Sequence, residues 1–172
     1  MNEAIRNMIA RKSCRKYKAE QIKDGELDIV LKAGTHAPTG MNRQSPVIIA
    51  VQDPETVREL SRLNASVMGS DGDPFYGAPT VVIVLADPSV RTYREDGSLV
   101  IGNMLNAAYS IGLGSCWIHR AREVFDMPEG KALLKKWGID RELVGIGNCI
   151  LGYPDGPLHD EFPRKDGYII KV

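Results

Sequence analysis

The sequence lacks several features, and each absence excludes a class of protein. Its 172 residues include 22 basic and 22 acidic ones, and this balance argues against the nucleic-acid affinity that a basic domain provides. No apolar run reaches the roughly 18 residues that a membrane-spanning helix needs. The first residues contain an early acid and no long apolar core, so we expect no signal peptide. Neither nucleic acid nor a membrane is an expected partner.

Cysteine is also scarce. Cys14, Cys116 and Cys149 are odd in number, lie far apart and form no CxxC pair. This usage argues against structural disulfides and a zinc site, and it fits a reducing compartment. The three histidines have no carboxylate at metal-ligand spacing. We therefore predict a cytoplasmic protein without a metal centre.

Three common catalytic signatures are missing. Gly112-Leu113-Gly114 ends a helical pattern instead of opening one, so it does not match a dinucleotide-binding fingerprint. No glycine loop runs into GKS or GKT, which excludes a P-loop. Ser115 has no glycine two residues later, which excludes a nucleophile elbow. Because no acid–base pair or nucleophile stands out, we predict no catalytic side chain and expect a cofactor to supply the chemistry.

The chain length and an ordinary hydrophobic fraction of 43% predict a single globular domain over residues 1–172. Asp53-Pro54 is typical of a helix N-cap and first helical position. Residues 64–79 show no clear period; within them we expect a loop at 70–74, with Phe75-Tyr76 as an apolar flap. The alternation in 168–172 predicts an edge strand that needs a sheet to join. Hydrophobic periodicity predicts helices at 2–10, from 24 or 25 to 34, after Pro54, at 99–113 and at 129–137, and strands at 47–51, at 80–86, after Gly114 and at 143–152.

Two polar segments are candidate binding elements. In residues 11–18, five of eight side chains are cationic. By itself such a run is either a solvated face or a site for an anionic group, to which Arg offers a planar fork of donors and Ser13 a hydroxyl. The loop at 35–46 places Thr39, Asn42 and Gln44 directly before a strand. Alone, this loop is either a plain connector or a reader of a planar polar ligand.

Four segments together resemble the flavin-dependent nitroreductase family, in the right order and nearly from end to end. Residues 11–15 resemble its RRSxR signature, with Lys12 in place of the second Arg. Residues 37–44 resemble the APSxxNxQ loop, although Ser45-Pro46 stands where Pro-Trp is usual. Residues 112–117 resemble the GLGxxW segment, and Pro163-Arg164-Lys165 resembles a late basic element.

The resemblance implies an α+β, nitroreductase-like fold, with a central, mainly antiparallel sheet flanked by helices. It also implies an intertwined homodimer with FMN at the interface. The implied reaction is ping-pong hydride transfer from NADH or NADPH through FMN to a nitroaromatic, quinone or related small-molecule acceptor. Two alternatives remain: a flavin-binding storage or sensor protein without turnover, and a relative with other flavin chemistry, such as dehalogenation or flavin breakdown.

The resemblance also assigns binding residues by position. The basic stretch and the late basic pair would bind the phosphate and ribityl chain. The polar loop of the other subunit would contact the edge of the isoalloxazine, and the segment after Gly114 would lie along the ring. The implied FMN-binding residues are Arg11, Lys12, Ser13, Arg15, Thr39, Asn42, Gln44, Trp117, Ile118, His119, Arg164 and Lys165.

Overall fold

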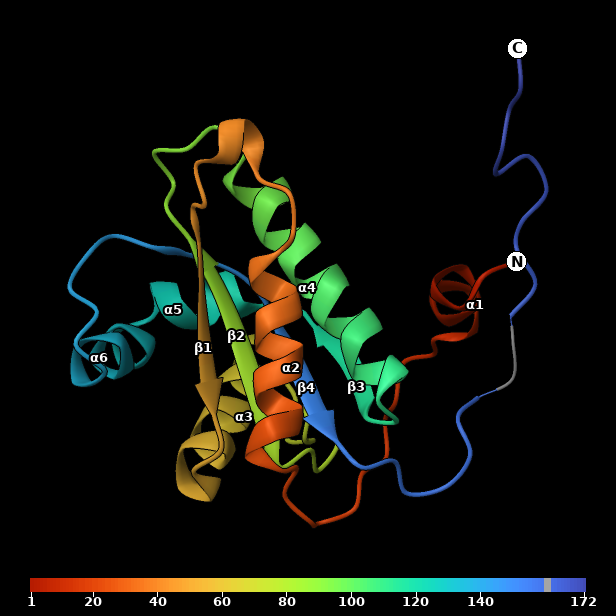
Figure 1. The fold of residues 1–172 in the computed structure, drawn as a ribbon. Coiled ribbons are helices and arrows are strands. Elements are labelled where there is room, and N and C mark those ends of the chain that lie inside the picture. Colours follow the sequence, from red (N-terminus) through yellow and green to blue (C-terminus); the bar gives the residue numbers. More distant parts are fainter. Residues whose placement is uncertain (160–161) are drawn as a thin grey trace.

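The computed structural model describes residues 1–159 and 162–172. At its centre is a four-stranded sheet in the order β1-β2-β4-β3, in which each neighbouring pair is antiparallel (Figure 1). The strands are β1 (Pro46–Val51), β2 (Thr80–Ala86), β3 (Gly114–Ile118) and β4 (Val144–Gly152). The helices are α1 (Glu3–Ala10), α2 (Asp24–Thr35), α3 (Pro54–Met68), α4 (Tyr93–Ser110), α5 (Ala121–Asp126) and α6 (Pro128–Lys136), with a 3-10 turn η1 (Gly40–Asn42). The fold is therefore α+β, as the resemblance implied.

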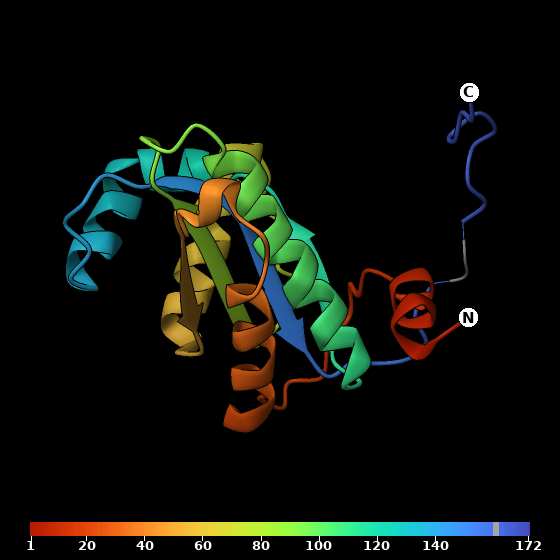
Figure 2. The ribbon, with the colours of Figure 1, turned by 45° about the horizontal axis from the view of Figure 1, so that its top comes forward.

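Helices cover both faces of the sheet (Figures 1 and 2). Side chains of β2 alternate between two core clusters: Val81, Ile83 and Leu85 pack on the side of α3 and α5, and Val82 and Val84 on the side of α2 and α4. Because both faces are buried, β2 is a continuous apolar run in the sequence, and it is fully buried in the structure.

Most predicted elements are confirmed, and α3 is longer than expected. Asp53 caps α3 by accepting a 2.8 Å hydrogen bond from the Thr56 backbone N–H, and Pro54 occupies the first turn. The helix continues through Asn64, from which the sequence shows no clear period, and ends at Met68, just before the loop expected at 70–74. The apolar face continues through the buried Ala65, and Gly69 then ends the helix with φ of 64°.

Three other expectations need correction. Phe75 is only 2% exposed and belongs to the core, so it is not part of a flap, whereas Tyr76 beside it is 42% exposed. Helix α4 begins at Tyr93 and not at Leu99, because its first turns bury Asp96 and Gly97 against the rest of the fold. Helix α5 was not predicted, since six residues are too few to show a period.

The C-terminal segment pairs with no strand in the part of the chain that the structure describes. Residues 162–172 are all exposed. Figures 1 and 2 show this tail running away from the sheet on the side where α1 lies. The predicted edge strand at 168–172 is therefore wrong for one chain by itself. Among the described helices, none is both long enough and apolar enough to cross a membrane.

Candidate functional site

The basic stretch lies along the edge of the sheet. The backbone N–H of Cys14 donates to the carbonyl of Ser115 in β3 at 2.9 Å, and that of Lys18 donates to the carbonyl of Tyr153 just after β4, also at 2.9 Å. The hydroxyl of Tyr17, which is buried, donates to the Cys14 carbonyl at 2.8 Å. Backbone bonds at both ends therefore hold residues 14–18 in one conformation.

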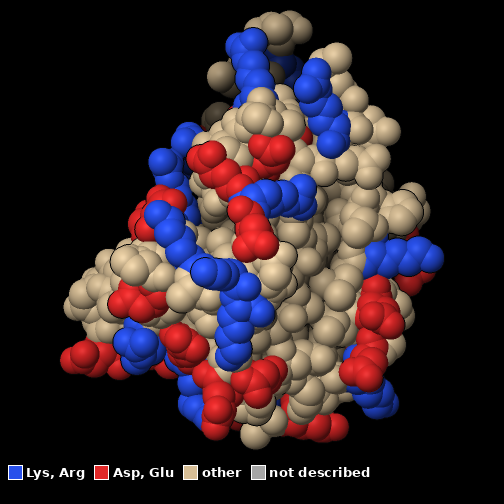
Figure 3. Space-filling model, turned by 90° about the vertical axis from the view of Figure 1, so that its left-hand side faces the viewer, with Lys and Arg blue, Asp and Glu red and all other residues tan. Residues whose placement is uncertain are grey.

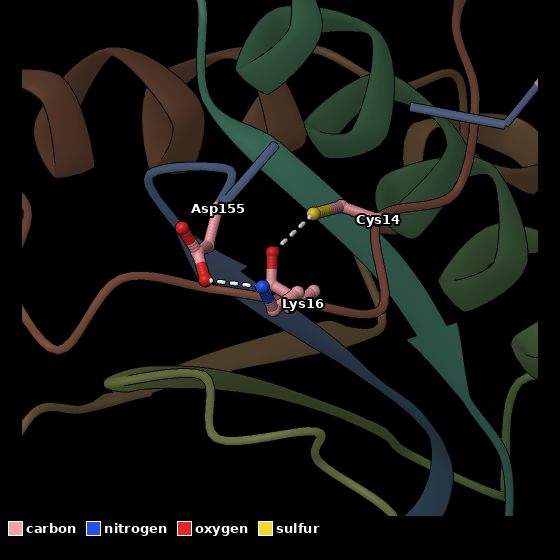
Figure 4. A network of polar contacts seen from close by, with 3 residues as sticks. All are labelled: Cys14, Lys16 and Asp155. Carbon is pink, nitrogen blue, oxygen red and sulfur yellow. Dashed lines mark hydrogen bonds and ion pairs between the residues drawn. The ribbon is translucent and has the colours of Figure 1, made fainter. Parts of the chain in front are cut away.

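Close packing fixes the middle of this stretch. A Cβ on Gly114 would lie 2.7 Å from Cys14 Sγ, so only glycine leaves room for the stretch to approach β3. Figure 4 shows the thiol of Cys14 donating to the Lys16 carbonyl at 3.1 Å, and the Lys16 ammonium pairing with Asp155 at 2.7 Å. Lys16 and Lys18 are exposed.

Arg11 precedes this clamp and has an unused donor. Within residues 1–159 and 162–172, its Nη1 atom is buried without a hydrogen-bond partner, as is Oγ of Ser115. Burial raises the pKa of the Cys149 thiol to about 12, and the nearby positive charge of Arg11 opposes that rise. An unpaired buried donor costs about 1–3 kcal/mol, more for a charged group. A bound anion would remove this cost, so the residues present fit a phosphate at Arg11.

A cavity of about 420 Å³ lies beside the basic stretch. Four of the predicted ligand residues line it: Arg15, Trp117, Ile118 and His119. Tyr76, half of the expected flap, also lines it, and the remaining lining residues are Met68, Ser70, Gly72, Asp73, Pro74, Cys116 and Arg120. The structure therefore brings Arg15 of the basic stretch and the end of β3 to one cavity.

Trp117 and Ile118 point to opposite faces of β3, because side chains alternate along a strand. The ring of Trp117 lies against Gly147 of β4, where an added Cβ would be 2.7 Å from Cζ2. Ile118 is 6% exposed and packs in the other core cluster with Val124. The cavity contacts both because it follows the edge of β3.

Two residues that sequence reasoning missed hold the end of β3. Asn64 is 1% exposed; its Nδ2 donates to the His119 carbonyl at 2.8 Å, and its Oδ1 accepts from Arg120 Nε at 3.1 Å. Arg120 itself has φ of 73°, an uncommon value for a residue other than glycine. The signal was available: Asn64 is an amide at a position of α3 where the period calls for an apolar side chain.

Asp96 was also missed, and it holds the polar loop. This carboxylate is 2% exposed on the first turns of α4. One oxygen accepts from the Gly40 backbone N–H at 2.9 Å, and the other accepts from the hydroxyls of Ser45 and Thr92, each at 3.1 Å. These contacts fix Gly40 and Ser45, and Asn42 and Gln44 lie between them.

The predicted residues of the polar loop contact one another. Oγ1 of Thr39 accepts from the Gln44 backbone N–H at 3.1 Å, and Nε2 of Gln44 donates to Asn42 Oδ1 at 3.2 Å. Met41, Asn42 and Gln44 have φ of 53°, 52° and 50°. Left-handed non-glycine residues cost about 1–3 kcal/mol each and cluster where ligands bind.

One chain does not assemble the whole predicted set. The polar loop precedes β1 and the basic stretch lies along β3, and these two strands are opposite edges of the sheet. Lys12 and Ser13 are partly exposed beside Arg11. Arg164 and Lys165 lie on the exposed tail, where Lys165 Nζ is 5.6 Å from the Tyr168 ring centroid. The set therefore forms three separate groups.

Comparison with known proteins identifies the family. Residues 8–74, which contain both the basic stretch and the polar loop, match the model of the nitroreductase family. A curated protein of Archaeoglobus fulgidus, provisionally named NADH dehydrogenase/NAD(P)H nitroreductase, is 31% identical over 160 residues, or 90% of this chain and 87% of that protein. The chain belongs to the nitroreductase family.

Solved structures agree with this assignment. The nitroreductase of Bacteroides fragilis NCTC 9343, described with bound FMN, is 33% identical with a TM-score of 0.92, and the match covers 100% of both chains. A nitroreductase of Desulfitobacterium hafniense DCB-2, also described with bound FMN, is 26% identical with a TM-score of 0.89 over 100% of this chain and 99% of that one. The expected nitroreductase fold is confirmed.

Proposed function

We propose that this nitroreductase is an FMN-dependent NAD(P)H oxidoreductase that reduces nitroaromatic, quinone or related acceptors. One observation carries the proposal: the buried, unpaired Nη1 of Arg11 lies four residues before Arg15, which lines the 420 Å³ cavity. A buried cationic group without a partner suits a ligand with an anionic end, and Arg15 of the same basic stretch contacts the cavity that could hold the rest of such a ligand. The FMN-bound relatives of similar fold supply the candidate ligand.

In this proposal the basic stretch holds the phosphate of FMN. Arg11 and Arg15 offer forked donors, Ser13 a hydroxyl and Lys12 a point charge. Charge-assisted hydrogen bonds contribute about 1.5–3 kcal/mol each, so a few converging ones suffice for firm binding. The backbone clamp of Cys14 keeps these donors in place before the ligand arrives, which lowers the entropy cost of binding.

The end of β3 borders the isoalloxazine ring, with Trp117, Ile118 and His119 along it. FMN supplies the redox chemistry when bound, since it takes a hydride from NADH or NADPH and passes electrons to the acceptor. The chain positions the ring and excludes water around it. Asn64 supports this region indirectly, because it holds the His119 carbonyl and the Arg120 side chain.

The separation of the polar loop from the basic stretch supports a homodimer, in which Thr39, Asn42 and Gln44 reach the FMN held by a second copy. Apolar side chains of α1 and the tail support it too, because such exposure is typical of an interface. They are 43–122% exposed: Ile5, Met8, Ile9, Tyr168, Ile169, Ile170 and Val172.

The tail and β1 provide further support for an intertwined arrangement. In the described chain β1 pairs only with β2, so its outer edge has unpaired backbone groups. Figure 3 views the side where β1 lies, and an uncharged band runs beside the charged part of that face. A second copy would give the tail strand a sheet to join and would carry Arg164 and Lys165 to the FMN phosphate. We propose that residues 1–172 form a single domain and that two copies of the chain form a cytoplasmic homodimer.

The test is spectroscopic. Purified protein should be yellow or become so with added FMN, and sedimentation should give twice the 18.9 kDa of one chain. Without oxygen, NADH or NADPH should bleach the flavin absorbance, and a quinone should restore it. A colourless protein that fails to bind FMN refutes the proposal. Flavin that neither nucleotide bleaches would identify a storage or sensor protein instead.

A further inference from the structure

A second, larger cavity of about 730 Å³ lies on the other side of the segment 70–73. Ser70, Gly72 and Asp73 line both cavities, so this segment is their common wall. The larger cavity opens between α3 and the chain that leads into β2, and none of the predicted FMN-binding residues lines it.

The common wall is fixed to α3. The carboxylate of Asp73 accepts from the Ser61 hydroxyl, from the Phe75 backbone N–H at 2.8 Å and from the Gly77 backbone N–H at 2.6 Å. Both oxygens are therefore occupied by donors. Asp71, the other carboxylate of this wall, also lines the cavity. The wall is a built structure and not a loose loop.

The opposite end of the cavity is fixed as well. Gln21 accepts from the Thr80 hydroxyl at 2.7 Å and donates to the Pro79 carbonyl at 3.2 Å and to the Gln52 carbonyl at 3.4 Å. Both the oxygen and the nitrogen of the Gln21 amide therefore form hydrogen bonds that hold this end of the cavity in place. A preformed cavity loses less conformational entropy when it binds a small molecule.

Apolar and cationic groups line different parts of this cavity. Val57, Phe75 and Ala78 are 8%, 2% and 3% exposed and provide an apolar floor. Arg58 and Arg62 follow one another at a spacing of four residues on α3, so they lie on the same side of the helix. Within the described residues neither arginine forms a salt bridge. An apolar floor beside two available guanidinium groups suits a ring that carries an anionic group.

We infer that the larger cavity binds the anionic, ring-bearing end of a substrate whose reacting part enters the neighbouring cavity. Two substrates share this chemistry: NADPH, through its 2′-phosphate and adenine, and an aromatic acceptor that carries a carboxylate. In either case Arg58 and Arg62 select the anionic substrate over its uncharged or unphosphorylated analogue. The role as a substrate anchor rests on the proposed oxidoreductase function, whereas binding of the anion does not.

Direct titration with two probes, 2′,5′-ADP and 4-nitrobenzoate, tests the binding step. Arg58→Gln/Arg62→Gln should weaken at least one of them about 10- to 100-fold. Lys131→Gln/Lys135→Gln, which also removes two positive charges spaced four residues apart, from the exposed face of α6, should leave both unchanged. The inference is overturned if the wild type binds neither probe, or if the double variant binds both as the wild type does.

Steady-state kinetics then identify the substrate. If the cavity anchors NADPH, the double variant should raise the KM for NADPH about tenfold or more and leave the KM for NADH unchanged. If it anchors the acceptor, the KM for 4-nitrobenzoate should rise and that for nitrobenzene should not. Unchanged values for all four substrates overturn the role as an anchor. FMN binding and NADH-driven reduction of a neutral quinone should persist in the variant. If the wild type itself shows neither of them, the proposed function is refuted, whatever the result for the anion cavity.

Discussion

Oδ1 of Asp96 accepts a 2.9 Å hydrogen bond from the backbone N–H of Gly40, although 56 residues separate the two in the chain. A Cβ on Gly40 would lie 2.2 Å from Oγ1 of Thr92, so the loop sits directly on the start of α4. This contact explains how a segment with three left-handed non-glycine residues keeps one shape. Three hydrogen bonds and the nearby positive end of the α4 dipole offset the cost of burying this carboxylate.

Asp96→Ala should therefore destabilise the protein by about 3 kcal/mol, because it leaves the Gly40 N–H and the hydroxyls of Ser45 and Thr92 without their acceptor. Guanidinium unfolding monitored by circular dichroism measures this loss. Limited proteolysis should also cut residues 39–45 faster than in the wild type.

Asp96→Asn separates hydrogen bonding from charge. One amide oxygen can still accept from Gly40, and the hydroxyls of Ser45 and Thr92 can turn to accept from the new NH₂. The asparagine variant should therefore be less destabilised than the alanine variant. Equal stability of alanine variant and wild type would show that this network does not hold the loop.

Gly114→Ala tests the packing of the basic stretch on β3. The added methyl would lie 2.7 Å from Cys14 Sγ and 2.8 Å from its Cβ, so residues 13–15 must shift. We expect a loss of about 1–3 kcal/mol in unfolding free energy. FMN affinity should fall as well, since Ser13 and Arg15 flank the displaced residue. Gly25→Ala is the matched control, because nothing lies within 4 Å of its added Cβ. Similar stability in both variants would contradict the packing argument.

Arg11→Ala tests the phosphate assignment. Removal of the guanidinium, whose Nη1 is buried, should raise the Kd for FMN about 10- to 100-fold, which corresponds to about 1.5–3 kcal/mol. The melting temperature should rise less on addition of FMN than it does for the wild type, because a ligand of the folded state stabilises by mass action. Quenching of flavin fluorescence gives the Kd.

Lys16→Ala is the control for this measurement. It removes a charge from the same stretch, but Lys16 is exposed and paired with Asp155. Its Kd for FMN should stay within about threefold of the wild-type value. Equal losses in the two variants would mean that the stretch acts only as a diffuse positive field, and an unchanged Kd for Arg11→Ala would exclude Arg11 from the phosphate site.

Much of the fold was predictable from local pattern. The run at 80–86 is buried on both faces, as a continuous apolar strand should be, and Asp53-Pro54 marks a helix start by local chemistry. The run at 47–51 is a strand as expected, but at the edge of the sheet it is mostly only partly buried. The prediction failed where tertiary packing overrides local pattern. Polar Asn64 stays in α3 because its amide meets partners on the β3–α5 turn. Phe75 is buried in the core, although the residues around it in the sequence are rich in glycine and acids and therefore indicated an exposed loop.

The candidate site was partly predictable for a different reason. The family resemblance identified Arg15, Trp117, Ile118 and His119, which the structure brings to one cavity. Asp96 could not be found this way, because its role depends on a contact across 56 residues and no local pattern marks it. The tail was called a strand from its alternation, yet a strand needs a partner, and one chain offers none to 168–172 in the described residues.

A pH dependence should arise from Glu26 and Tyr153. The Tyr153 hydroxyl donates to Glu26 Oε2 at 2.6 Å, and the Lys23 backbone N–H donates to the same oxygen at 2.9 Å. The Tyr153 bond, followed by the Lys23 bond, lowers the pKa of Glu26 below its usual 4.5. The carboxylate therefore stabilises the folded state fully above about pH 4.5, and this contribution is lost as the pH falls through the lower, folded-state pKa.

Tyr153→Phe should accordingly be less stable than the wild type at pH 7, and the difference should shrink as the pH falls through the lowered folded-state pKa of Glu26, since the carboxyl then becomes protonated in both folded proteins. Urea unfolding at pH 7, 5, 4 and 3 measures the difference. Glu26→Gln should remove the same pH-dependent part, and adding Tyr153→Phe to it should restore no dependence. Tyr76→Phe, at a tyrosine that is 42% exposed, is the control and should follow the wild type at every pH. A Tyr153→Phe difference that stays constant from pH 7 to 3 would show that the tyrosine acts by packing and not through the carboxylate.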